Sequence, residues 1–499
     1  ALALANTGER FGYYTMIAVF SLFLRANFGL SGNTAGVIYG VFLALVYFLP
    51  LVGGIMADKF GYGKMVTIGI IVMFAGYLFL SIPLGGGVMG YAAMFGALLL
   101  VSLGTGLFKG NLQVMVGNLY DAPELSAKRD SGFSIFYMAI NIGALFAPTA
   151  AVRIKEWAEH SLGYSGNDAY HFSFAVACVS LIVSMMIYYA FRSTFRHVEA
   201  GAGKSKKTDT AGTEEELTPQ QTKERIVALC LVFAVVIFFW MSFHQNGLTL
   251  TFFADEFVNP KSEGVQTMAF DVINLVMIIF MIYSIMSFFQ SKTSKAKLIS
   301  TVVFLAAVGV LVYKYHNIGG PVDVSAPIFQ QFNPFYVVAL TPVSMAIFGA
   351  LAAKGKEPTA PRKIAYGMII AGSAYLLMVL ASRGLLTPNE QTAAKAAGET
   401  VPFASGNWLI GTYLILTFGE LLLSPMGISF VSKVAPPKYK GTMMGGWFVA
   451  TAIGNLLVSV GGFLWNDIPL TIVWSVFIVL CLLSAGFMFL MMKRLEKVA

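Results

Sequence analysis

Long apolar runs follow one another along almost the whole chain, separated by short polar links. Each run has roughly 20 residues, the length that a helix needs to cross the ~30 Å hydrocarbon layer of a bilayer. The fourteen predicted spans are residues 6–28, 33–56, 64–84, 89–117, 132–153, 171–191, 226–257, 268–289, 297–314, 335–353, 364–382, 408–432, 442–465 and 469–492. Because this number is even, both ends of the chain are expected on the same side of the membrane.

The composition supports this interpretation. Hydrophobic residues make up 57% of the 499 residues and charged residues only 12%, whereas a soluble domain carries about 25% charged residues. A soluble globular protein is excluded, and an all-α membrane protein is expected. Cys178, Cys230 and Cys481 fall within apolar runs, which favours buried hydrophobic side chains over a disulfide set. The first run contains Glu9 and Arg10, so we expect no cleavable signal peptide.

Basic residues in the links predict the orientation. With a cytoplasmic N-terminus, the links on that side hold 24 of the 33 Lys and Arg residues, and the opposite links hold seven. Cytoplasmic links carry such an excess, so both termini are expected in the cytoplasm and the protein in the inner (plasma) membrane. The bias also explains the net charge of +8 without a nucleic-acid partner.

The longest hydrophilic stretch divides the chain. Residues 192–225 contain Gly201, Gly203, several lysines and the run Glu214 to Glu216, which is typical of a flexible cytoplasmic linker, with a short helix from Thr218. Six spans precede it and eight follow. Two six-helix bundles around a central loop are the pattern of a carrier. The predicted domains are a bundle at 1–191, the linker at 192–225 and a second bundle at 226–499.

Two of the later spans are surplus to a carrier of twelve core helices. The best candidates are 268–289 and 297–314, because neither has an ionisable residue in its interior. Spans without a polar face have no cavity to line. This pair, at about 268–314, is therefore expected to pack outside the transport core.

Five ionisable residues inside spans are the candidate functional groups: Glu9, Arg10, Lys109, His244 and Glu420. A charge at the centre of the bilayer costs about 2.5–3.5 kcal/mol on insertion scales, so each charge implies a partner. Two acids and two bases sum to zero, the least costly way to keep charges in a cavity of low dielectric. We expect these groups to face one another across a cavity in a proton-driven carrier of a small zwitterion, most simply a short peptide.

The turn between the second and third spans contains Gly54, Asp58 and Gly61. Glycines permit a close approach of helices and a sharp reversal, and Asp58 can cap or pair with a neighbouring helix end. On its own the turn is a positively charged cytoplasmic loop. Its spacing resembles the loop signature of the major facilitator superfamily, which implies a carrier lobe and no particular substrate.

Five motifs resemble those of the proton-dependent oligopeptide transporter (POT) family of that superfamily. They are Glu9-Arg10-Phe11 with Tyr13-Tyr14, the run Gly104 to Asn111, the run Phe133 to Leu145, the run Gly419 to Pro425, and Trp447-Phe448. The motifs occur in the family's order. The resemblance extends over all twelve core helices and implies the two-bundle major facilitator fold.

The resemblance also implies a role for each matching residue. Arg10 and Lys109 would face the carboxylate of the substrate, and Glu420 with Asn333 would hold its ammonium group. Tyr13, Tyr47, Asn141, Trp240, Trp447 and Phe448 would line the pocket.

The residues themselves leave some of these roles open. Asn141 is equally suited to an interhelical hydrogen bond, and the tryptophans to the core or the membrane interface. Gly419 and Pro425 beside Glu420 predict a bend used in gating or only in packing.

A coupling mechanism follows from the same charges. Ionised Glu9 competes for Arg10 or Lys109, and its protonation releases a cation for the substrate carboxylate, while Glu420 stays ionised and binds the ammonium group. Release of the proton to the cytoplasm would expel the substrate. The proton-coupling candidates are therefore Glu9, Arg10, Lys109, His244 and Glu420.

Several positions depart from the family pattern. Asn6 and Ile17 stand where the family has a Glu and an Arg, His244 stands where it often has an acid, and Gly110 where it often has Pro. These changes affect the proton route and the strength of carboxylate binding. His244 could relay protons, because its unperturbed pKa is near 6.5, or be a neutral residue that bonds two helices.

Other functions receive less support. A carrier of nitrate or another small anion remains an alternative, which Glu420 disfavours by repelling a plain anion; a non-transporting sensor is a further one. Enzyme motifs, repeated pore loops and clusters of metal ligands are lacking, so neither a cofactor nor a metal is expected. The remaining histidines, His160, His171, His197 and His316, are expected in loops. The protein is expected to work as a monomer, with the proton gradient as its energy source.

Overall fold

The computed structural model describes residues 1–125, 129–200, 217–436 and 439–499. Within these residues, thirteen helices are long and apolar enough to cross a membrane. The first helix, α1 (Leu2–Phe28), has 27 residues and is not among the thirteen. Glu9, Arg10 and Arg25 interrupt its apolar sequence. The fold is therefore that of an all-α membrane protein, as the hydropathy pattern predicts.

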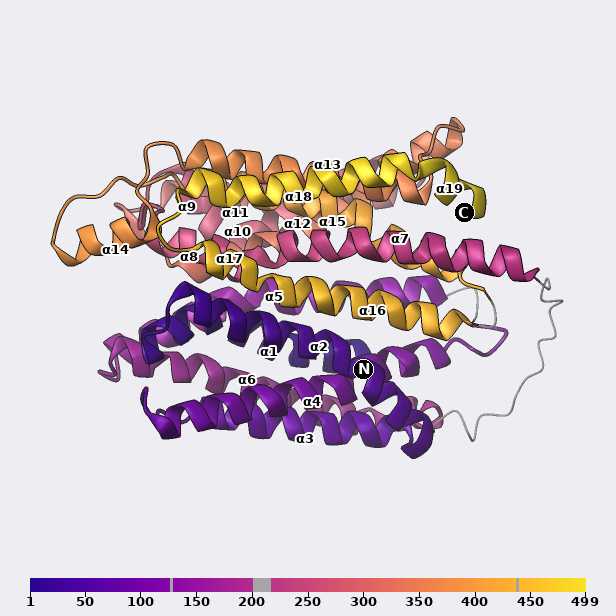
Figure 1. Ribbon diagram of the computed structural model, residues 1–499, viewed down its shortest axis with the longest axis horizontal. Coiled ribbons are helices and arrows are strands. Elements are labelled where there is room, and N and C mark those ends of the chain that lie inside the picture. Colours follow the sequence, from indigo (N-terminus) through magenta and orange to yellow (C-terminus); the bar gives the residue numbers. More distant parts are fainter. Residues whose placement is uncertain (126–128, 201–216, 437–438) are drawn as a thin grey trace.

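The first bundle fills the lower half of Figure 1. Its members after α1 are α2 (Gly32–Phe60), α3 (Tyr62–Leu80), α4 (Val88–Asn118), α5 (Arg129–His160) and α6 (Gly166–Ala190). The short turns η2 (Arg192–Thr194) and η3 (Arg196–Val198) follow. Glycines allow α2 and α4 to lie in close contact, since a Cβ on Gly53 of α2 would lie only 2.0 Å from the carbonyl oxygen of Gly106 in α4.

Most of the second bundle lies in the upper half of the same view. It contains α7 (Pro219–Phe243), η5 (His244–Gly247), α8 (Thr249–Glu256), α9 (Val265–Phe270), α10 (Val272–Gln290), α11 (Ser294–His316), η6 (Ala326–Gln331), α12 (Phe332–Ala353), α13 (Ala360–Ala381), α14 (Pro388–Ala396), α15 (Asn407–Val434), α16 (Lys440–Leu457), α17 (Ser459–Leu464), α18 (Leu470–Leu490) and α19 (Met492–Val498). The strands β1 (Lys261–Ser262) and β2 (Val322–Asp323) pair antiparallel.

Two predicted spans are interrupted. The span at 226–257 is broken by the 3-10 turn η5, so that α7 ends at Phe243 and α8 starts at Thr249. The span at 442–465 is divided between α16 and α17 at Val458. The two breaks lie side by side: the Gln245 side chain of η5 donates a hydrogen bond of 3.0 Å to the carbonyl oxygen of Val458. Apolar residues surround both breaks, so hydropathy does not reveal them.

The start of α7 follows the local sequence. Thr218 accepts a hydrogen bond from the backbone of Gln221, whose side chain bonds back to Thr218, and Pro219 occupies the first helical position. This capping box satisfies N–H groups that a helix start otherwise leaves free. A helix does begin here, but it is the start of the long helix α7 and not a separate short helix of the linker. The glycines, lysines and glutamates predicted between 201 and 216 lie outside the described residues.

The surplus helices α10 and α11 form a hairpin at the edge of the second bundle. Only 11% of the apolar window of α11 is buried in the protein, compared with 56% for the window that contains α7. The hairpin is attached through α10, where the Tyr283 hydroxyl donates to the carbonyl oxygen of Val338 in α12 over 2.9 Å. Its own links include the ion pair of Lys314 with Asp271.

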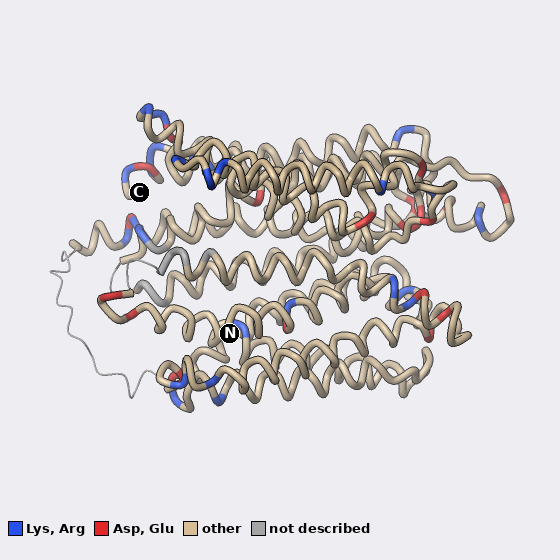
Figure 2. Tube along the Cα trace, turned by 180° about the vertical axis from the view of Figure 1, so that it is seen from behind, with Lys and Arg blue, Asp and Glu red and all other residues tan. Residues whose placement is uncertain are grey.

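The charged residues gather at the two ends of the helices, and few lie along the middle (Figure 2). Both chain termini lie toward the end of the bundles at which α7 begins (Figure 1). Three histidines expected in loops are helical instead: His160 and His316 end α5 and α11, and His171 is buried within α6. His171 is helical because α6 begins five residues earlier than predicted. Its Nδ1 atom forms a hydrogen bond with the carbonyl oxygen of Leu80.

Candidate functional site

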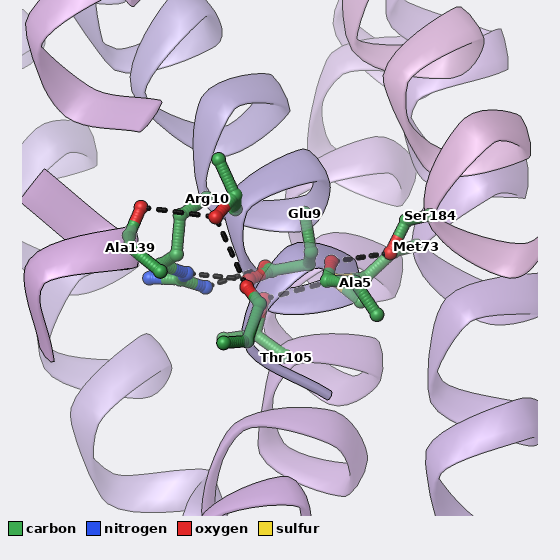
Figure 3. A network of polar contacts seen from close by, with 9 residues as sticks. Ala5, Glu9, Arg10, Met73, Thr105, Ala139 and Ser184 are labelled. Atoms are coloured by element: carbon green, nitrogen blue, oxygen red, sulfur yellow. Dashed lines mark hydrogen bonds and ion pairs between the residues drawn. The ribbon is translucent and has the colours of Figure 1, made fainter. Parts of the chain in front are cut away.

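The acid and the base of α1 pair with each other. The Nε and Nη2 atoms of Arg10 both donate to the carboxylate of Glu9, its immediate neighbour, and both side chains are buried. The guanidinium also lies over the ring of Tyr13, 4.5 Å from the ring centroid. Figure 3 shows the two side chains turned toward each other on the same helix. Among the described residues, Arg10 is thus neutralised within α1 and not by another helix.

The helices around this pair contribute hydroxyl groups that bond locally. Ser184 of α6 donates to the carbonyl oxygen of Ala5, one turn before Glu9, and Thr105 of α4 donates to the sulfur of Met73 over 3.4 Å (Figure 3). Asn6, which stands where the family has Glu, is 3% exposed. Its Nδ2 atom has no hydrogen-bond partner among the described residues.

Lys109 of α4 is arranged differently from Arg10. Its Nζ atom lies over the ring of Tyr47 from α2, 4.1 Å from the centroid. In the described part of the chain, no carboxylate forms an ion pair with it, although Glu9 and Arg10 are within electrostatic range. A cation–π contact satisfies an ammonium group only in part. Lys109 therefore keeps donors for a further acceptor.

The contact of Lys109 with Tyr47 continues into the second bundle. The Tyr47 ring lies 5.9 Å from the ring of His244, which stacks at 5.2 Å on Trp240 of α7. Lys109, Tyr47, His244 and Trp240 thus form a continuous column, hereafter the aromatic column, across both bundles. On its far side, Nδ1 of His244 lies 2.5 Å from Oδ1 of Asn455 in α16. Asn455 is absent from the sequence-based candidates.

Glu420 of α15 is held from its own bundle. Asn333 of α12 donates from Nδ2 to Oε2 of Glu420 and to the hydroxyl of Thr417, both over 3.0 Å. No Lys or Arg forms an ion pair with Glu420 within the described ranges. The carboxylate is within electrostatic range of Tyr14 and Tyr47 of the first bundle. The acid Glu420 and the bases Arg10 and Lys109, which were predicted to face each other, thus all lie near the tyrosines of the first bundle.

The remaining pocket candidates differ in placement. Asn141 donates to the carbonyl oxygen of Tyr137 in its own helix over 3.0 Å. Trp447 is buried against Gly427 of α15, where a Cβ would lie 2.0 Å from its ring. Phe448, the next residue, is 40% exposed. Successive helical residues point about 100° apart, so Phe448 and Trp447 leave α16 in different directions.

The turn between α2 and α3 has a defined conformation. Gly61 has a φ of +100°, which only glycine adopts readily, and the Tyr62 hydroxyl donates to Asp58 over 2.7 Å. A Cβ on Gly54 would meet no atom within 4 Å. The close approach of α2 to α4 therefore depends on Gly53 and not on Gly54. Pro425 lies inside α15, which continues from Asn407 to Val434 without interruption.

Beside this turn is a pocket of about 510 Å³ that Lys59, Lys64 and the segment after α6 line. In that segment, Arg192 donates two hydrogen bonds of 2.8 Å to Glu199, one to each carboxylate oxygen. These bonds raise the pKa of Arg192 above its ordinary value. The backbone N–H of Gly63 donates to the carbonyl oxygen of Glu199 over 3.1 Å, which fastens the segment to α3.

At the end of the bundles away from the termini, the two halves are joined. Arg25 at the end of α1 forms an ion pair with Glu256 at the end of α8, and Glu256 also accepts from the Trp465 indole over 3.2 Å. Nearby, α2 and α17 touch through backbone, since a Cβ on Gly36 would lie 3.0 Å from the Cα of Gly462. In the sequence, Arg25 is distinguished only as a basic residue near the end of the first predicted span.

Two helical bundles with buried acids and bases at their interface define the class of a two-lobed membrane carrier. No group of His, Cys, Asp and Glu among the described residues is arranged to hold a metal ion. A family model described as the POT family matches residues 63–211 and 314–473, which together are more than half of the chain. The chain belongs to the POT family, and the predicted family and fold are both confirmed.

Individual relatives agree. The chain is 27% identical over 466 residues to dipeptide and tripeptide permease B of Xenorhabdus bovienii, covering 90% of this chain and 83% of the relative. It is 29% identical over 480 residues to a di-/tripeptide transporter of Lactococcus lactis subsp. cremoris, covering 90% and 85%. A crystal structure of the peptide transporter POT in complex with sulfate superposes with a TM-score of 0.74 at 22% identity, covering 100% of this chain and 94% of that one.

Proposed function

We propose that the protein is a proton-driven symporter that takes up di- and tripeptides by alternating access. The observation that carries the proposal is the arrangement of buried charges: Arg10 and Lys109 in the first bundle, and Glu420 in the second, around shared tyrosines. A zwitterion with charges at its two ends matches this separation of sign. The names of the relatives, which are peptide permeases and transporters, support the same substrate class.

In this proposal the substrate carboxylate binds to the bases of the first bundle. Lys109 is available at once, because its ammonium group contacts only the Tyr47 ring among the described residues. Arg10 becomes available when Glu9 releases it. The substrate ammonium group binds Glu420, which Asn333 already orients with a 3.0 Å hydrogen bond. Tyr13, Asn141, Trp240, Trp447 and Phe448 are the further proposed lining residues.

Proton coupling is proposed to act through the pair of Glu9 and Arg10. The carboxylate occupies two donors of the guanidinium, so the substrate carboxylate and the Glu9 carboxylate compete for the same group. Protonation removes the charge of Glu9 and weakens both hydrogen bonds. Loss of the proton to the cytoplasm restores the pair and displaces the substrate. His244 in the aromatic column is the second proposed proton-accepting group.

In the proposed alternating-access cycle, the ion pair of Arg25 with Glu256 is part of the gate between the two bundles. This ion pair and the contact of Gly36 with Gly462 close the end away from the termini, so this end must open to admit substrate. The protein is proposed to lie in the inner (plasma) membrane with both termini in the cytoplasm, so that end faces away from the cytoplasm. The turn with Asp58 and Gly61, and Pro425 in α15, are proposed to assist the movement.

The test is uptake by purified protein in proteoliposomes. Labelled di- and tripeptides are expected to accumulate with an inside-alkaline pH gradient, and a protonophore is expected to abolish the accumulation. Competition by unlabelled peptides, free amino acids and nitrate measures the substrate class. Accumulation of nitrate in place of peptides would favour the small-anion carrier. Specific peptide binding without any accumulation would favour a sensor. The protein is proposed to work as a monomer and without a cofactor. The molecular mass of the same preparation in detergent tests the monomeric state.

A further inference from the structure

His244 lies at a break in a membrane-spanning element. It follows the last residue of α7 and starts the turn η5, so its backbone leaves the regular helix at the level of the aromatic column. The ring is held on one face by Trp240, with an interplanar angle of 20°, and is approached by Tyr47 from the first bundle. Stacking defines the plane of the ring but leaves open which of its two nitrogens carries hydrogen.

Asn455 decides this question. It is fully buried on α16, and its Oδ1 atom lies 2.5 Å from Nδ1 of His244. An amide oxygen can only accept a hydrogen bond, so Nδ1 carries the hydrogen and the other ring nitrogen, Nε2, has the lone pair. The Nδ2 atom of Asn455 has no partner among the described residues, so the contact of Oδ1 with His244 is the interaction that orients this amide.

The backbone fixes Asn455 in this place. Its neighbour Gly454 lets α16 lie directly against α7: a Cβ there would be 2.6 Å from the carbonyl oxygen of Ile237 and 2.8 Å from the Cβ of Trp240. One turn further, Gln245 bonds to the carbonyl oxygen of Val458 over 3.0 Å. The register of α16 against the helix break is therefore held on both sides of Asn455.

The groups around the His244 ring determine what a change in its charge would act on. In the part of the chain that the structure describes, the charged group within electrostatic range of His244 is Lys109 of α4, and the titratable group that packs on its ring is Tyr47 of α2. The residues of its own element in contact with the ring, Trp240 and Phe243, do not titrate. A carboxamide neither gains nor loses a proton in the working pH range, so its bond to Nδ1–H persists whether the imidazole is neutral or charged.

We propose that Asn455 is a positioning residue that holds His244 in its Nδ1–H form and so reserves Nε2 as the atom that takes up and releases a proton during transport. The inference rests on the proposed proton-coupled function. In each cycle an Nε2–H bond forms when the imidazole is charged and breaks when it becomes neutral, while the Nδ1–H bond stays intact. The cation formed next to Lys109 raises the positive charge that a peptide carboxylate meets.

The first experiment reads the hydrogen directly. Nitrogen NMR of the full-length protein with isotope-labelled histidine, in lipid at alkaline pH, distinguishes the two neutral forms of the ring, and the spectrum of His244→Gln assigns its signal. The expected result is the Nδ1–H form in the natural protein and a shift toward the Nε2–H form in Asn455→Leu. An Nε2–H form in the natural protein overturns the proposal, whether or not the protein transports peptides.

The second experiment reads the proton during transport. Peptide counterflow with equal pH on both sides is measured across a pH series for Asn455→Asp and Asn455→Leu. A carboxylate beside Nδ1–H stabilises the charged imidazole, so the midpoint of the Asp variant is expected to move up by about one pH unit or more, and that of the Leu variant to move down. The shift is expected to vanish when His244→Gln is added to Asn455→Asp.

Outcomes of this series separate the possible failures. A purely structural role of Asn455 would lower the rate of every variant without moving the midpoint, which overturns the inference. An equal shift in the presence of His244→Gln would overturn it as well. Absence of gradient-driven peptide accumulation by the natural protein refutes the proposed function instead. If the variants do not insert, the tautomer of the natural protein still decides.

Discussion

Arg10 is bound by Glu9, the residue directly before it on α1, through two hydrogen bonds to one carboxylate. Neighbouring residues on a helix do not normally face each other, so the pair needs both side chains to turn to the same side. Burial makes this arrangement consequential, because an unpaired guanidinium would be costly at this depth. A carboxylate that competes with substrate for a cation is the simplest device for exchange between a proton and a peptide.

Glu9→Gln is expected to uncouple transport from the pH gradient. The amide cannot bind and release a proton in this range and holds the guanidinium less strongly than a carboxylate. Gradient-driven accumulation of a labelled dipeptide should therefore fall to about the level of equilibration, while counterflow persists. Glu159→Gln, which removes an acid paired with Lys155 at the opposite end of the first bundle, is the matched control. Intact accumulation by Glu9→Gln would show that Glu9 is not the coupling group.

Glu420→Gln is expected to weaken recognition of the peptide amino terminus. A hydrogen bond to a charged group contributes about 1.5–3 kcal/mol, which corresponds to roughly 10- to 100-fold in affinity. The KM for a dipeptide with a free amino group should rise by this factor. Competition by an N-acetylated dipeptide serves as the internal comparison, and its affinity should change little. An equal loss for both peptides would mean that Glu420 does not bind the ammonium group.

The elements of the fold were predictable because the spans are read from hydropathy alone. Runs of about 20 apolar residues have few structures open to them in lipid, so their number and order follow directly. The interruption at His244 to Gly247 was not predicted, since its four residues, His-Gln-Asn-Gly, are too few to break the long apolar run on either side. Asn455 was missed for the same reason: an isolated amide in an apolar run has no signature that separates it from an ordinary interhelical bond.

The site was predictable in composition and less so in geometry. Charges within spans identify Arg10, Lys109 and Glu420, because the membrane makes an ionisable residue exceptional. Sequence adjacency does not fix direction, which is why Trp447 is buried while Phe448 is 40% exposed. Arg25 is near the end of its helix, where a basic residue is unremarkable, and only the fold shows that it meets Glu256 from the other bundle.

Breaking the pair of Arg25 and Glu256 is expected to favour the state open at that end. The pair is partly exposed, with side-chain exposures of 27% and 13%, and such pairs contribute up to about 1 kcal/mol. Arg25→Gln should therefore shift the opening equilibrium by no more than about fivefold, with a wider distribution of distances between spin labels on the outer ends of α2 and α17. The charge-reversed double variant, Arg25→Glu with Glu256→Arg, should restore part of the natural distribution. No change in either variant would remove the pair from the gate.

Deleting the hairpin of α10 and α11 is expected to spare transport. The hairpin is largely exposed, is joined to α12 by the hydroxyl of Tyr283, and carries no residue of the aromatic column. A variant that joins residue 270 to residue 318 through a short Gly-Ser linker keeps α9. It should retain gradient-driven uptake within about twofold of the natural rate per inserted molecule, with reduced thermal stability because the contacts with α12 are lost. Tyr283→Phe, which removes only the hydroxyl, is the matched control and should leave uptake unchanged. Complete loss of uptake by a deletion variant that is inserted and monodisperse in detergent would place the hairpin inside the transport machinery.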